Sequence, residues 1–224
     1  MEAMHLIGSP ASPFVQRCAI IARSKGLDIE IAPIPGGAMH SPEFQALSPM
    51  GRIPLLVLDD GTHICESSAI AAYLDEALDG PSLMPMSPLE RARVREIEAI
   101  ATLEIASGLR PTMIHRIFRV SENEALVAAG IAQTDKGCTA LARLLSNAAY
   151  AVGDTITQAD AALVPVVTLA TIIADQPEVG ALLEQHAFLI PYLERAERDP
   201  VLARTVSEMR GAFAAIRARM SQPA

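Results

Sequence analysis

Two serines stand in a proline-rich turn directly before an apolar, helix-like stretch. Ser9 and Ser12 belong to the run SPASPFVQR, and the spacing of the apolar residues up to a Lys25-Gly26 stop signal predicts a helix. A serine hydroxyl at the start of a helix can cap it by accepting a backbone N–H bond. It can also donate a hydrogen bond to an anion held at the positive end of the helix dipole. Both roles stay open at this point.

Thiol and metal chemistry have little support in the sequence. The three cysteines, Cys18, Cys65 and Cys138, form no CxxC pair and no Cys/His cluster with the spacing of metal ligands. Scattered cysteines are typical of reduced, buried thiols in the cytosol. We therefore expect no metal site.

Composition and charge narrow the class of protein. The chain has 224 residues, half of them hydrophobic, with a net charge of -8. The sequence has no lysine- or arginine-rich block that could bind a row of phosphates, so we expect no nucleic-acid partner. The first residues lack the pattern of a signal peptide, and no window reaches the roughly 18 apolar residues of a membrane span, so we expect a cytoplasmic protein with no membrane partner.

The elements that would position the serines form a small α/β pattern. Apolar or alternating runs predict strands over 4–8, 29–34, 53–58 and 63–65, with a hairpin turn at 59–61 between the last two. One helix is predicted from Pro13 and another from Ser67.

The second part of the chain has a different character. Its helical patterns cover 89–119, 122–150, 157–174, 177–184, 188–198 and 201–220. A Pro/Met/Gly-rich linker over 79–87 separates them from the α/β part. The predicted domains are therefore 1–78, which is α/β, and 88–224, which is all-helical.

This organisation resembles the cytosolic glutathione transferases, whose first domain is thioredoxin-like and whose second is all-α. Five features in register carry the resemblance over nearly the whole chain: SPFVQR from Ser12, GRIPL over 51–55, Glu66-Ser67, GDTITQAD over 153–160, and LIPYLER over 189–195 followed by Asp199-Pro200. The fourth feature also has capping-box spacing from Thr157 to Asp160, with Ile156 as a staple residue. The resemblance implies the glutathione transferase fold.

The SPF segment is similar to that of the serine-type classes, whose serine hydroxyl faces the sulfur of glutathione. This implies that Ser12 is the catalytic residue, with Ser9 as the competing hydroxyl and a plain helix cap as the structural alternative. Because serine stands where cysteine-type classes have CPF, disulfide exchange through a protein cysteine there is not expected. Arg17, one turn into the same helix, could support the serine-containing turn or add positive electrostatic potential near the sulfur.

The other motifs imply the glutathione-binding residues. Pro54 corresponds to the family's cis-proline, which turns the backbone of Ile53 toward an extended peptide ligand. Arg52 matches a basic position that binds the glycyl carboxylate in a fork. His40 stands where related classes have a lysine, and its alternative role is that of a solvated loop histidine.

Glu66 and Ser67 match the family's acid-serine pair. The Glu66 carboxylate can accept bonds from the ligand's α-ammonium, while Ser67 and the helix N-terminus can hold its α-carboxylate. Together these residues would bind the γ-glutamyl end of glutathione.

The first long helices would supply the wall of the electrophile pocket. Apolar candidates are Ile105, Leu109, Met113, Ile114 and Phe118, and polar candidates are His115, Arg116 and Arg119. Ordinary helix packing is the alternative for the apolar set.

The resemblance implies a glutathione S-transferase that conjugates the glutathione thiolate to small, mostly apolar electrophiles in detoxification. Family members usually form two-fold homodimers, which we expect here as well. A glutathione-dependent isomerase or dehalogenase is an alternative, although the isomerase class carries an SSCS-like segment where this chain has SPASPF. A non-enzymatic binding protein with the same fold is a further alternative.

Overall fold

The computed structural model describes residues 4–221, so residues 1–3 and 222–224 of the predicted domains lie outside the described residues. The described chain forms two compact units. Unit 1 contains residues 4–83 and 204–221, and unit 2 is Met84–Ala203. The predicted division instead assigned residues 88–224 to one helical domain. Whether residues 1–78 and 88–224 are independently folding domains stays a prediction.

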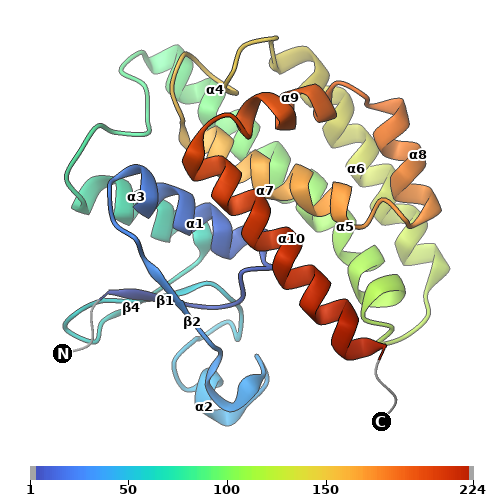
Figure 1. Ribbon diagram of the computed structural model, residues 1–224, viewed down its shortest axis with the longest axis horizontal. Coiled ribbons are helices and arrows are strands. Elements are labelled where there is room, and N and C mark those ends of the chain that lie inside the picture. The colour runs from blue at the N-terminus through green and yellow to red at the C-terminus, as the bar shows by residue number, and fades with distance from the viewer. Residues whose placement is uncertain (1–3, 222–224) are drawn as a thin grey trace. The chain divides into compact units, whose positions relative to one another are not determined.

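A four-stranded sheet forms the centre of unit 1 (Figure 1). Strand β1 (His5–Ile7) pairs parallel with β2 (Glu30–Ala32) and antiparallel with β3 (Leu55–Val57), which pairs antiparallel with β4 (His63–Cys65). The order is β2-β1-β3-β4. All four predicted strands are present, and the predicted turn at 59–61 joins β3 to β4.

Two helices cover one face of this sheet. Helix α1 (Pro13–Ser24) packs beside α3 (Ser67–Ala77), and both lie on the same side of the sheet in Figure 1. Leu6 and Leu56 are fully buried and share one side of the pleat, because they are paired across β1 and β3. Burial of this face holds α1, and with it the Ser9–Ser12 turn, against the sheet.

A short segment covers the opposite face. The turn η1 (Pro35–Gly37) and helix α2 (Pro42–Gln45) were not predicted, because a stretch rich in glycine, proline and serine has no hydrophobic period. Phe44 of α2 is fully buried in a cluster with Ile7 and Leu55. This packing fixes the chain that leads to the predicted ligand residues before β3.

The C-terminal helix α10 (Pro200–Met220) belongs to unit 1 from Arg204 onward. Its Glu208 accepts hydrogen bonds from Gln16 and Arg23 of α1. The two helices therefore lie side by side, although 192 positions separate Gln16 from Glu208.

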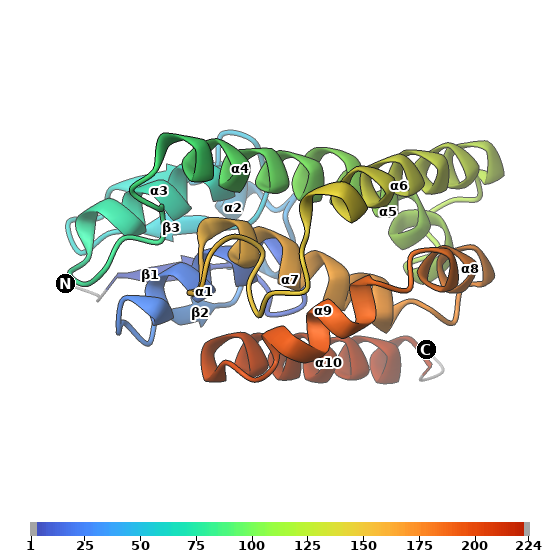
Figure 2. The same ribbon diagram turned by 90° about the horizontal axis from the view of Figure 1, so that it is seen from above.

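Unit 2 is built of helices around a buried centre. Its elements are α4 (Pro88–Ala99), the π-helical segments η2 (Ile100–Ala106) and η3 (Met113–Ile117) on either side of α5 (Ser107–Thr112), α6 (Glu124–Leu144), α7 (Gln158–Ile172), α8 (Pro177–Gln185) and α9 (Leu189–Ala196). Helix α7 is buried from Gln158 to Ala170 and lies between α4 and α9 in Figure 2. Within residues 4–221, no helix combines the length and apolar character that a membrane crossing requires.

The predicted helix over 122–150 is too long. It ends at Leu144, and Leu145 takes an extended conformation. Tertiary hydrogen bonds hold the following residues outside the helix: Arg195 Nε donates to the Ala148 carbonyl at 2.9 Å, and the Tyr150 hydroxyl donates to Asp199. Such long-range contacts override local helix propensity.

The predicted helix-start motif of unit 2 is confirmed. The Asp160 carboxylate accepts the Thr157 N–H at 3.0 Å and the Thr157 hydroxyl at 2.9 Å. It also accepts the Ala151 N–H and the Tyr192 hydroxyl. These bonds fix the start of α7 and the loop before it.

Candidate active site

The register of the sheet brings the predicted ligand residues to one edge. Ile7 at the end of β1 is paired with Leu55 at the start of β3, and Leu55 is paired with Cys65 at the end of β4. The turn after β1, the Ile53-Pro54 pair before β3 and Glu66 after β4 therefore leave the sheet at the same edge. Three separate sequence motifs of unit 1 converge there.

Ser12 is the N-cap of α1, as predicted. Its backbone is extended (φ -81°, ψ 124°), and its Oγ accepts the Val15 N–H at 3.4 Å. Within residues 4–221, no acceptor is found for the proton of this hydroxyl. Because capping uses only the oxygen, the half-buried hydroxyl can still donate to an anion at the helix N-terminus.

Ser9 has a similar hydrogen-bonding state. Its Oγ accepts the Ala11 N–H at 3.3 Å, and its carbonyl accepts the Ser12 N–H at 2.9 Å. Its hydroxyl proton has no acceptor in the described part of the chain. Position distinguishes the two serines, since only Ser12 lies at the N-cap of α1.

The Ile53-Pro54 peptide bond is cis, which confirms the prediction. The Ile53 side chain packs against the cluster around Phe44. Among the described residues, neither its N–H nor its carbonyl has a hydrogen-bond partner. Unpaired backbone groups beside a strand end can add an extended peptide by hydrogen bonding.

Glu66 has an unusual backbone for a residue with a side chain, with φ 65° and ψ 116°. Such a conformation costs about 1 to 3 kcal/mol and is found most often at ligand-binding and catalytic positions. Glu66 is exposed and makes no side-chain cap of α3. The first N–H groups of the helix from Ser67 are therefore available to a carboxylate.

The two residues predicted to bind the glycyl carboxylate, Arg52 and His40, have exposed side chains. Arg52 is held through its backbone, since Ser48 Oγ accepts its N–H at 3.3 Å and donates to its carbonyl at 3.2 Å. Within residues 4–221, the Arg52 guanidinium has no ion-pair partner, and His40 makes no side-chain hydrogen bond. Their roles toward a ligand carboxylate stay predictions.

The cysteines are placed as small buried side chains. Burial raises the pKa of Cys18 to about 12 against the opposing charge of Arg17, and it raises the pKa of Cys138 to about 12 as well. Cys65 is half-buried in β4. The described residues include no group of three or more His, Cys, Asp or Glu that could hold a metal ion.

The pocket candidates of unit 2 separate into two groups. Ile105 and Leu109 are buried, which favours helix packing, whereas Phe118 is 42% exposed. Arg116 is engaged with Glu124 and, at 3.4 Å, with Glu178. The roles of these residues, and of Met113, Ile114, His115 and Arg119, toward an electrophile stay predictions.

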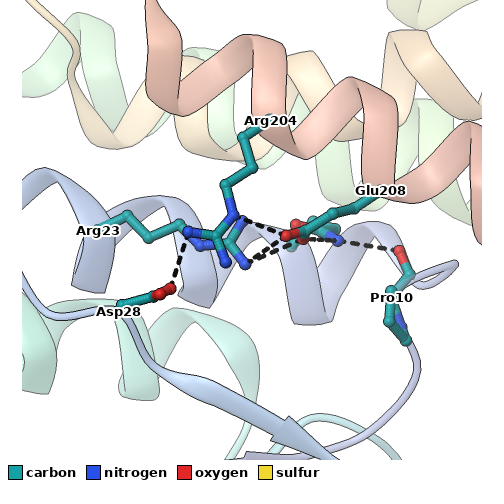
Figure 3. A network of polar contacts seen from close by, with 6 residues as sticks. Pro10, Arg23, Asp28, Arg204 and Glu208 are labelled. Atoms are coloured by element: carbon teal, nitrogen blue, oxygen red, sulfur yellow. Dashed lines mark hydrogen bonds and ion pairs between the residues drawn. The ribbon is translucent and has the colours of Figure 1, made fainter.

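A partly buried polar network beside the Ser9–Ser12 turn was missed by the sequence reasoning (Figure 3). It joins Pro10, Gln16 and Arg23 to Glu208 on α10. The only local signal is a glutamine among the buried residues of α1. Its partner on α10 carries no local signal at all.

Comparison with known proteins decides the family. A family model described as glutathione S-transferase, N-terminal domain, matches residues 6–82. Maleylacetoacetate isomerase of Rattus norvegicus is 34% identical over 203 residues, which cover 84% of this chain and 92% of the rat protein. The chain belongs to the cytosolic glutathione S-transferase family. Glutathione S-transferase 3 of Zea mays is 33% identical over 204 residues, covering 82% of this chain and 89% of the maize protein.

Solved structures show the same fold. The glutathione S-transferase of Methylobacterium radiotolerans, crystallised with glutathione sulfonate, superposes with a TM-score of 0.78 at 24% identity, covering 92% of this chain and 95% of that chain. The enzyme of Methylobacillus flagellatus with GSH bound gives 0.76 at 20% identity, covering 91% and 98%. The predicted fold class, a thioredoxin-like part with a helical part, is confirmed.

Proposed function

We propose that this protein is a transferase that binds glutathione along the edge of the unit 1 sheet and activates its thiol for conjugation to small, mostly apolar electrophiles. The observation that carries the proposal is the convergence at one sheet edge of a free hydroxyl donor on Ser12, the unpaired backbone of Ile53 and the open start of α3 at Glu66-Ser67. The bound glutathione and glutathione sulfonate of the two solved relatives support it.

Each part of the tripeptide has a matching group in this arrangement. The γ-glutamyl ammonium would meet the Glu66 carboxylate, and the α-carboxylate would meet Ser67 and the N–H groups of α3. The cysteinyl backbone would pair with Ile53 as an added strand. The glycyl carboxylate would meet Arg52, with His40 as the second candidate.

The Ser12 hydroxyl and the α1 dipole are sufficient in size to activate the thiol. A free thiol with a pKa near 8.5 is only about 3% thiolate at pH 7. Lowering its pKa by about two units requires roughly 2.7 kcal/mol of preference for the anion. A hydrogen bond to a charged group supplies about 1.5 to 3 kcal/mol, and a helix end about 0.3 to 1 kcal/mol. No general base is needed.

Glutathione-dependent isomerisation is the second candidate, and the relatives favour it. Maleylacetoacetate isomerases of rat and of Pseudomonas aeruginosa are 34% and 31% identical to this chain. In an isomerisation the thiolate would add to an unsaturated carbon and leave again, so glutathione would be regenerated. We place conjugation first because residues 9–14, SPASPF, lack the cysteine of the SSCS-like isomerase segment.

The test follows the fate of glutathione with the purified full chain. With an aryl halide we expect glutathione to be consumed and a conjugate to form. Ser12→Ala should reduce turnover about 10-fold or more, since it removes a hydrogen bond to the thiolate. Ser9→Ala, the matched loss of a hydroxyl in the same turn, should retain most activity.

Three results would change the proposal. Undiminished turnover in Ser12→Ala, with loss in Ser9→Ala, would transfer the role to Ser9. Isomerisation of maleylacetoacetate without net loss of glutathione, together with no conjugation, would establish the second candidate. No glutathione binding by calorimetry up to millimolar concentration would favour a non-enzymatic binding protein.

A further inference from the structure

The side chain of Gln16 is fully buried in α1 and uses both of its amide hydrogens. Nε2 donates to the Pro10 carbonyl at 3.0 Å and to Glu208 Oε2 at 3.1 Å (Figure 3). Because both neighbours are acceptors, Nε2 and not Oε1 must face them, which fixes the orientation of the amide. Gln16 therefore links the Ser9–Ser12 turn directly to α10.

Glu208 is a charged and firmly held anchor. Arg23 Nη2 lies 2.9 Å from both carboxylate oxygens, and Arg204 Nε lies 2.8 Å from Oε1 while its Nη1 pairs with Asp28 at 2.8 Å (Figure 3). Burial acts to raise the pKa of Glu208, but hydrogen bonds from Arg204 and Gln16 and the Arg23 charge outweigh it and hold the pKa below its ordinary value. The carboxylate is therefore ionised at neutral pH.

The two bonds of Nε2 are the only side-chain hydrogen bonds of Gln16 within residues 4–221. Its Oε1 is buried and has no hydrogen-bond partner within residues 4–221. If Glu208 were removed, one amide hydrogen would also be left without an acceptor. A buried polar group without a hydrogen-bond partner is energetically costly. The amide would then turn and release the Pro10 carbonyl, which lies between the two candidate hydroxyls.

We propose that Glu208 is a positioning residue for the Ser9–Ser12 turn and acts through Gln16 on the Pro10 carbonyl. The catalytic consequence of this role rests on the proposed function, because the turn carries the hydroxyl that would bind the thiolate. Small displacements of a catalytic group lower rates strongly, with about 100-fold for a misplacement near 1 Å. Loss of Glu208 should therefore affect activation of the thiol more than binding of the tripeptide.

The first experiment measures the turn without any ligand. Amide hydrogen exchange is compared in the full-length wild type, Glu208→Ala, Glu208→Gln and Glu184→Ala, the last removing an exposed carboxylate of α8 that is not part of the network. We expect faster exchange over 9–16 in Glu208→Ala alone. In Glu208→Gln a neutral amide oxygen can still accept from Gln16, so the turn should be retained. Unchanged exchange over 9–16 in Glu208→Ala would overturn the proposal whether or not glutathione binds.

The second experiment measures the consequence in catalysis. In Glu208→Ala and Gln16→Leu we expect kcat to fall about 10-fold and the thiol pKa of bound glutathione, read from the pH profile, to move toward its free value near 8.5. The Kd of glutathione should change less than about twofold, because its binding groups are untouched. A wild-type pH profile with only lower thermal stability would overturn the positioning role. Failure of wild type itself to bind glutathione would instead contradict the proposed function.

Discussion

The Ser12 hydroxyl accepts the Val15 N–H with its oxygen and keeps its proton for another partner. The sequence left capping and thiol activation as alternatives, but the hydrogen-bond geometry makes them compatible. What the sequence could not provide was the state of the neighbouring groups. The unpaired backbone of Ile53 and the positive φ of Glu66 follow from tertiary packing and have no local code.

Glu66 is the residue at which we expect stability and binding to conflict. Glu66→Gly should raise the free energy of unfolding by about 1 kcal/mol, because relief of a strain of about 1 to 3 kcal/mol exceeds the entropic cost of glycine, about 0.5 to 1 kcal/mol. The same change should weaken glutathione binding, since the acceptor for the ligand ammonium is lost. Urea unfolding and calorimetry measure the two effects.

Glu66→Gln is the matched control for this prediction. It keeps the strained backbone, so its stability should equal that of wild type, while glutathione binding weakens through the loss of charge. If Glu66→Gly were less stable than wild type, the conformation of Glu66 would not be strained. If both variants bound glutathione normally, Glu66 would have no role in recognition.

Helix α1 is held by polar contacts at both ends. The contact at its N-terminus could be predicted from the sequence, and the one at its C-terminus could not. Its N-terminus was predicted from Ser12 and Pro13, because capping is encoded locally. At its C-terminus, Lys25 was predicted only as part of a stop signal. In the structure its Nζ forms a buried ion pair with Asp75 of α3 at 3.0 Å.

Asp75 also fixes the segment after α3. It accepts the Leu83 N–H at 2.9 Å and the Ser82 hydroxyl at 3.0 Å. We predict that Asp75→Asn lowers the free energy of unfolding by about 3 kcal/mol, because it leaves the buried Lys25 charge without its partner. Urea unfolding at neutral pH measures the loss. A change below about 1 kcal/mol would contradict it.

The pH dependence of this contribution has a defined sign. Burial acts to raise the pKa of Asp75, but bonds from the Leu83 N–H, Lys25 and Ser82 outweigh it and hold the pKa below its ordinary value. The stabilisation is therefore complete above the unfolded pKa of about 3.9 and is lost as the pH falls through the lower folded pKa. Wild type should lose more stability than Asp75→Asn on acidification below about pH 4. Equal losses would contradict this.

Helix boundaries in unit 2 show why the remaining elements were predicted less well. The start of α7 was predicted because Thr157 and Asp160 form a local capping pattern. The end of α6 and the π-helical segments around α5 were not. At Gly108 and Gly130 the backbones of α5 and α6 approach so closely that a Cβ on either would clash with the other's carbonyl oxygen. Such an approach depends on how the two helices pack together, which no local pattern shows.

For the whole molecule, the order of strands and helices and the family were predictable because each motif is local and their spacing is fixed. The assignment of α10 to unit 1 was not, since its network with α1 depends on partners nearly the whole chain apart. The same distance explains why Glu208 was missed, whereas Ser12, Glu66 and Ser67 could be proposed from local motifs. An ion pair between residues near opposite ends of the chain produces no local pattern in a single sequence.

We also predict that the whole molecule is a homodimer. Large apolar side chains are exposed on the segment from the linker to η2, with Met86 94%, Leu89 73% and Leu103 64% exposed. A second copy would remove such surface from water. Sedimentation equilibrium should give twice the chain mass of 23.8 kDa. A single-chain mass at micromolar concentration would contradict the prediction, and Leu103→Glu, which should favour the monomer, locates the interface.

The most direct measurement is a pH titration of the thiolate absorbance of glutathione bound to wild type, Ser12→Ala and Ser9→Ala. We predict a pKa about two units below the free value of about 8.5 in wild type and in Ser9→Ala. In Ser12→Ala it should rise by at least about one unit, because one hydrogen bond to the anion is lost. An unshifted pKa in wild type, or the same pKa in wild type and Ser12→Ala, would contradict activation of the thiol by the Ser12 hydroxyl.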